Sequence, residues 1–126
     1  MKIEIRKYNP SQDYHPLHEV IQSEGEEWKD YLKPAYQESL EKSITYVACV
    51  DGIVCGYSRS MSDHGFFVWV IDLLVHKDYR GHSIGKKLLQ RICKDYPNEE
   101  VYVMSDVDTY YKKMGYKKEG SIFKIE

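Results

Sequence analysis

The chain has 126 residues, of which 42% are hydrophobic and 30% charged, with a formal net charge of −2 at pH 7. This length and composition are typical of one globular domain, so residues 1–126 are expected to share a single core. The longest apolar run, Phe66 to Val75, is too short to cross a bilayer, and the charged N-terminus lacks the apolar centre of a signal peptide. Neither a membrane nor a secretory role is therefore favoured, and a cytoplasmic location is expected.

In chain order, residues 2–8 predict a strand, and Asp13 is expected to cap a helix with an apolar face. A second helical stretch contains Trp28 and Tyr31, and Pro34 is expected to start a further short helix. β-branched and aromatic residues then predict three strands separated by turns. These strands span residues 44–50, 53–60 and 66–75, with a hairpin turn at residues 51–52.

The second half predicts a helix from about Ile84 to Asp95, because apolar residues recur at helical spacing there. A short strand over 101–104 follows, and Asp106 or Asp108 is expected to cap a two-turn helix ending at Gly115. Residues 116–125 predict one or two closing strands. The expected fold is α/β: a mixed, mostly antiparallel sheet flanked by about four helices.

Cysteine and histidine do not indicate a metal site. Cys49, Cys55 and Cys93 show no paired spacing and are interpreted as free thiols. His15 and His18 lie three residues apart, but no acidic or cysteine ligand completes a set around them. No metal is therefore expected.

Charge is distributed unevenly along the chain. Residues 13–41 contain eight acidic residues and two lysines, whereas residues 76–94 contain six basic residues and one aspartate. The first segment is expected to attract cations and the second anions, or both are solvated helix faces. The basic segment lacks base-reading Asn or Gln and interleaved aromatic residues, so nucleic-acid binding is not favoured.

The most informative stretch runs from Ile71 to Leu89, where a buried strand leads through a loop with two glycines into an amphipathic, basic helix. Unpaired backbone N–H groups and the helix dipole favour an anion at such a helix start. A Walker A loop is excluded, because only three residues separate Gly81 from Gly85 and no hydroxyl residue follows Lys86. A GxGxxG dinucleotide fingerprint is also absent. The stretch therefore predicts a different kind of phosphate site.

Arg80, Gly85 and the preceding apolar residues resemble the pyrophosphate-binding motif of the GNAT acyltransferase superfamily, Arg/Gln-x-x-Gly-x-Gly/Ala. Ser83 departs from that motif, since it stands where the family usually has its first glycine. The segment Thr109 to Tyr116 resembles a second family signature, Phe-Tyr-x-x-x-Gly-Phe. Together the two motifs and the order of elements extend the resemblance over essentially the whole chain.

The resemblance implies that the protein binds acetyl-CoA and transfers its acetyl group to a primary amine by direct attack. It implies that acetyl-CoA is held by ten residues, Leu73, Leu74, Val75, Arg80, Gly81, His82, Ser83, Ile84, Gly85 and Lys86. Tyr111 matches the family's usual proton donor to the departing thiolate.

The general base is less clear from the sequence. Asp72 is the only charge in its apolar run and is the candidate nearest to the motif, either as a base or as an acceptor ligand; His64 and a water relay are alternatives. The acidic first helices, with Trp28 and Tyr31, are expected to bind a small cationic acceptor. The main competing hypothesis is a non-catalytic acyl-CoA sensor of the same fold. Whether the protein forms a homodimer is left open.

Overall fold

A five-stranded sheet forms the centre of the protein, which we describe from a computed structural model of residues 1–126. Its strands lie in the order β1 (Ile3–Lys7), β2 (Ile44–Val50), β3 (Ile53–Ser62), β4 (Phe67–Val75) and β5 (Glu100–Val103). The first four pair antiparallel, whereas β5 joins β4 in parallel. The parallel pair requires a crossover, which α3 (Ile84–Asp95) provides. The predicted mixed α/β fold is confirmed.

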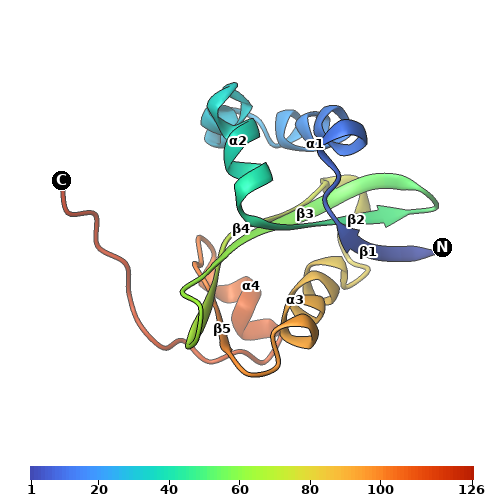
Figure 1. Ribbon diagram of the computed structural model, residues 1–126. Helices are drawn as coiled ribbons and strands as arrows, with labels where there is room; N and C mark the ends of the chain where they lie inside the picture. The colour runs from blue at the N-terminus through green and yellow to red at the C-terminus, as the bar shows by residue number, and fades with distance from the viewer.

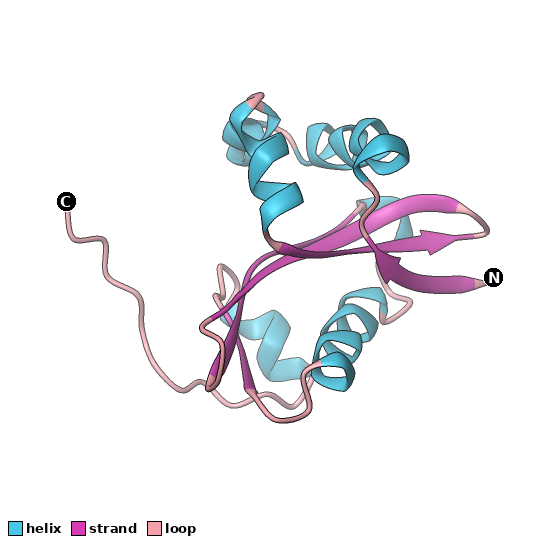
Figure 2. Cartoon of the chain, viewed as in Figure 1, coloured by secondary structure: helices cyan, strands magenta, loops and turns pink.

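Helices cover both faces of this sheet (Figures 1 and 2). On one face lie α1 (Pro10–Glu24), the 3-10 helix η1 (Glu26–Leu32) and α2 (Ala35–Lys42). The other face carries α3 and α4 (Asp108–Lys113), and a short 3-10 helix, η2 (Lys77–Tyr79), precedes α3. Each layer buries its own apolar cluster against the sheet. None of the helices combines the length and apolar character that a membrane span requires.

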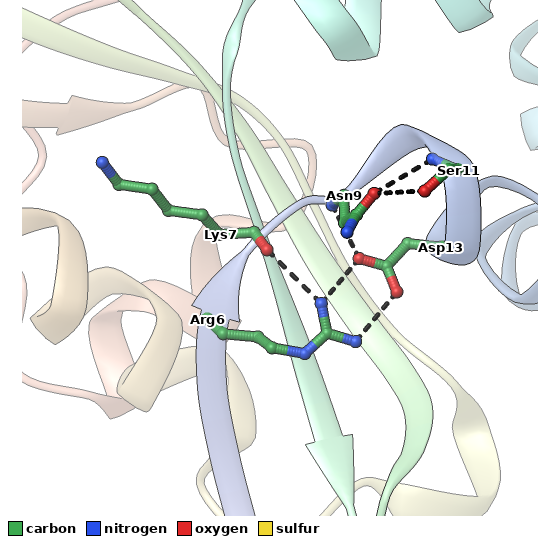
Figure 3. A network of polar contacts seen from close by, with 5 residues as sticks. All are labelled: Arg6, Lys7, Asn9, Ser11 and Asp13. Carbon is green, nitrogen blue, oxygen red and sulfur yellow. Dashed lines mark hydrogen bonds and ion pairs between the residues drawn. The ribbon is translucent and has the colours of Figure 1, made fainter.

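An ion pair with a buried carboxylate joins β1 to α1 (Figure 3). Both guanidinium Nη atoms of Arg6 donate to the Asp13 carboxylate, at 2.7 and 2.8 Å. Asp13 also accepts the backbone N–H of Asn9 at 2.8 Å, and Asn9 in turn caps the helix by accepting from Ser11 N. The prediction that Asp13 caps this helix is therefore wrong. Asn9 is the cap, and Asp13 lies one turn inside, where it fixes the helix to the sheet.

An extra residue in β4 changes which way its side chains point. Arg59 pairs with Asp72 while Ser60 pairs with Val70, so Ile71 has no partner in β3 and forms a bulge. Because of this bulge, Val70 packs in the cluster beneath α3, whereas Leu74 packs in the cluster beneath α1 and α2. Strict alternation would have placed both on one face.

The predicted closing strands are absent. Residues 116–126 form no strand, and Ile122, Phe123 and Ile125 are exposed, in a tail that leaves the body of the protein (Figure 1). A terminal strand depends on pairing with a distant edge, which a local pattern cannot report. The last helix was also predicted with the wrong cap, because Val107 occupies that position and Asp108 already lies inside α4.

Candidate active site

The loop before α3 has the backbone shape that the sequence indicates. Ser83 is the residue that precedes α3, and it adopts a left-handed conformation with φ of 59° and ψ of 26°. Such a conformation is natural for glycine and rare for serine, which explains why the motif has a glycine there. The Ser83 side chain makes no capping hydrogen bond to the helix. The first N–H groups of α3 are therefore left without a side-chain acceptor.

A cavity of about 430 Å³ opens at this helix start. It is lined by the loop, by the first residues of α3 and by α4, including Arg80, Gly81, Ser83, Ile84, Gly85, Lys86 and Lys113. A Cβ at Gly85 would meet the Tyr110 hydroxyl, so a side chain there would require the Tyr110 ring to move. Three cationic side chains and a helix N-terminus make this cavity suited to a diphosphate.

A second cavity, of about 310 Å³, adjoins the first, and Val75, Arg80 and Tyr110 line both. It lies where β4 and β5 separate. The last bond between these strands runs from Met104 N to Val70 O, at 2.9 Å. Beyond that point the β4 edge from Ile71 to Val75 faces the cavity without a partner strand. An extended, amide-containing ligand can pair with this edge as a further strand would.

Carboxylates and aromatic rings form the other walls of this second cavity. Glu24, Glu27 and Trp28 reach it from the end of α1 and from η1, and Asp106, Tyr110 and Tyr111 from the opposite side. Burial raises the pKa of the Tyr111 hydroxyl above its ordinary value near 10, so it stays protonated at neutral pH. Two tyrosines and three acidic side chains therefore surround a partly apolar space.

Arg80 connects the two cavities. Its Nε donates to the backbone oxygen of Val75 at 2.9 Å, and its Nη2 contacts the Glu24 carboxylate at 2.6 Å. The guanidinium is thereby held at the end of β4, between the helix start and the acidic wall.

Asp72 lies outside both cavities. Its Oδ2 accepts from Arg59 Nε at 2.6 Å and from the Tyr36 hydroxyl at 2.5 Å, and the residue is only 4% exposed. The Tyr36 ring contacts Tyr31, which contacts Trp28 in the cavity wall. A carboxylate that is paired and buried in this way is a poor proton acceptor for a substrate. The geometry instead favours a positioning role, exerted through the aromatic side chains.

Most of the other residues predicted from the sequence come together. Tyr111, Trp28 and nine of the ten proposed acetyl-CoA residues line one cavity or the other. His82 is exposed and lines neither cavity. Tyr31 also lines neither cavity, but its ring packs against Trp28, which does. Sequence reasoning missed the part played by Met104 and Asp106. Met104 ends the strand predicted over 101–104 and Asp106 lies just beyond it, and this position was the available signal because parallel strands end at a common edge.

The comparisons with known proteins agree with this geometry. Residues 41–118, more than half of the chain and including both motifs, match the acetyltransferase (GNAT) domain. The chain belongs to the GNAT family. Its sequence is 29% identical over 69 residues to the uncharacterized N-acetyltransferase Ycf52 of Porphyra purpurea, a match that covers 51% of this chain and 40% of that protein. The chain thus spans less than half the length of the curated relatives it matches.

Solved GNAT structures share the fold over nearly the whole chain. PaiA N-acetyltransferase from Thermoplasma acidophilum, in complex with coenzyme A, aligns with a TM-score of 0.76 and 21% identity, covering 97% of this chain and 94% of that one. An aminoglycoside acetyltransferase from a soil metagenome, in complex with sisomicin, gives a TM-score of 0.77 and 20% identity, with 98% and 95% covered. At these identities the likeness concerns the fold of this GNAT domain.

Proposed function

We propose that this GNAT domain transfers the acetyl group of acetyl-CoA to a primary amine of a small cationic acceptor. The observation that carries the proposal is the pair of adjoining cavities. One lies at a cationic helix start and the other beside an unpaired strand edge, and Arg80 lines both. A diphosphate in the first cavity would place the pantetheine arm along β4 and the thioester in the second.

The residues around the second cavity suggest how the chemistry proceeds. The acceptor nitrogen attacks the thioester carbon directly, and backbone N–H groups of β4 near Leu74 would stabilise the oxygen that gains negative charge. Tyr111, which is neutral and lines the cavity, would give its proton to the departing thiolate. The proton lost by the amine would pass to a cavity carboxylate or to solvent.

The preference for a cationic acceptor rests on the cavity walls. Glu24, Glu27 and Asp106 supply negative charge, and Trp28 supplies an aromatic face on which an ammonium group is attracted. Two structural neighbours are described as aminoglycoside acetyltransferases, which act on acceptors of this class. Both are too distant in sequence to identify the acceptor of this protein.

An amine panel tests the proposal. Spermidine, tobramycin, a lysine-containing peptide, a neutral amine and an acidic amine would each be incubated with acetyl-CoA, and free thiol release would be followed at low and high salt. We expect turnover of the cationic amines, with KM rising as salt screens the acidic wall. Stabilisation by acetyl-CoA without thiol release from any amine would favour the sensor hypothesis instead.

A further inference from the structure

The Glu24 carboxylate forms an ion pair with Arg80, the cationic residue that lines both cavities. The two side chains come from residues 56 positions apart, and Glu24 Oε2 is 2.6 Å from Arg80 Nη2. Glu24 is the last residue of α1, on the acceptor side of the site, whereas Arg80 belongs to the loop before α3. The Glu24 carboxylate thus neutralises the Arg80 guanidinium, which also lines the first cavity, at the start of α3.

We propose that Glu24 couples the binding of the two substrates, an inference that rests on the proposed function. In the free protein the Glu24 carboxylate holds Arg80. A diphosphate bound at the start of α3 competes for the same guanidinium, because both are anions that pair with it. Glu24 is then released into the second cavity, beside Trp28, where it can bind the ammonium group of the acceptor.

This exchange predicts that bound acetyl-CoA improves the affinity for the amine. Coupling between two ligands is reciprocal in free energy, so a bound amine would equally strengthen cosubstrate binding. The contact is partly exposed, with side-chain exposures of 50% for Arg80 and 24% for Glu24. An ion pair of this kind changes an equilibrium about two- to five-fold.

Glu27 provides a matched control. It lines the same cavity and carries the same charge, yet it makes no ion pair with Arg80. Glu24→Gln and Glu27→Gln therefore change the net charge equally. Glu24→Asp retains the charge but shortens the side chain by one methylene, so it weakens the contact without altering the electrostatic attraction of the cavity for ligands.

The experiment is isothermal titration of the full chain and these variants with CoA, ADP and pantetheine. We expect Glu24→Gln and Glu24→Asp to bind CoA and ADP about two- to five-fold more tightly than Glu27→Gln, and all of them to bind pantetheine equally. In the acetylation assay the KM for the amine should rise more for Glu24→Gln than for Glu27→Gln. Opposite effects on the two substrates are not expected from a merely structural role.

The outcomes separate this inference from the proposed function. If the unmodified protein fails to bind CoA, the proposed function fails, and this inference with it. If all variants bind CoA with the affinity of Glu27→Gln, only the coupling role of Glu24 is overturned. Tighter CoA binding without a change in the KM for the amine would overturn the release of Glu24 to the acceptor.

Discussion

Tyr111 is the residue on which turnover, as distinct from binding, is expected to depend. Tyr111 lines the second cavity, and burial raises its pKa, so that it keeps its proton as the pH rises through 10. A protonated phenol can donate to a thiolate throughout the range in which the protein would be assayed. Loss of the Tyr111 proton therefore should not lower kcat between pH 7 and about 9.5.

Tyr111→Phe should reduce kcat by about 10²- to 10⁴-fold, the usual contribution of a general acid, with acetyl-CoA affinity unchanged. The measurement is steady-state thiol release combined with titration of acetyl-CoA. Tyr116→Phe, in the same segment but absent from both cavities, is the matched control. A Tyr111→Phe protein with unaltered kcat across several pH values would remove the donor role.

Asp72 is expected to support the site through its buried ion pair with Arg59, rather than to act as the general base. Asp72→Asn would leave the Arg59 guanidinium, whose side chain is 14% exposed, without its charge partner. Breaking such a buried pair typically costs about 3–5 kcal/mol of unfolding free energy. Tyr36→Phe removes hydrogen bonds to Asp72 and to the buried Tyr57 hydroxyl but breaks no ion pair, and should cost about 1.5–3 kcal/mol.

Urea denaturation of these variants would measure both losses, with the exposed residue Asp78 as a control for an aspartate-to-asparagine change. If Asp72→Asn retains full stability yet loses all turnover, a direct catalytic role is supported over the positioning role.

At the scale of single elements, the loop before α3 carries strain that glycine would relieve. Ser83 is left-handed, with φ of 59°, and the conformation costs a non-glycine residue roughly 1–2 kcal/mol. Replacing Ser83 with glycine would remove this cost, but the greater freedom of glycine in the unfolded chain offsets part of the stabilisation. Ser83→Gly should therefore raise the free energy of unfolding by about 0.5–1 kcal/mol.

Chemical denaturation would test this expectation, with His82→Gly as the control in the same loop. His82 does not have a positive φ, so glycine relieves no strain there and should lower stability. A Ser83→Gly protein less stable than the original would contradict the strain argument.

The ion pair between Arg6 and Asp13 connects β1 to α1. Asp13 is 1% exposed and bonds both Arg6 and the backbone N–H of Asn9, so it contributes to the ion pair and to the helix start together. Asp13→Ala should lower the free energy of unfolding by about 3 kcal/mol. Glu19→Ala, in the same helix but in no ion pair, should change it by less than about 0.5 kcal/mol. Equal losses in the two variants would refute the connecting role of Asp13.

At the scale of the whole molecule, cosubstrate binding should stabilise the fold. The proposed acetyl-CoA site joins β4, α3 and α4, which are separate elements that the ligand would hold together. A ligand at 100 times its Kd adds about 2.7 kcal/mol to the stability of the folded state. Thermal melting with acetyl-CoA, desulfo-CoA and CoA should show a rise in Tm for all three, and no rise with any of them would contradict the site.

The sequence alone determined those features of the protein that depend on neighbouring residues. The helix from Ile84 to Asp95 and the hairpin at residues 51–52 were both predicted from local spacing, because backbone propensity and turn preferences act within a few residues. Tyr111 and the proposed acetyl-CoA residues came instead from the resemblance to the GNAT motifs, and their roles stay predictions.

Only the tertiary structure decided which distant groups meet. The bulge at Ile71 turns Asp72 toward Arg59 and Tyr36, and α1 brings Glu24 to Arg80 across 56 positions of sequence. Residues 116–125 were expected to close the sheet with one or two strands, yet residues 116–126 form none. Such pairings depend on packing between elements, where the free energy comes from contacts that no local pattern encodes.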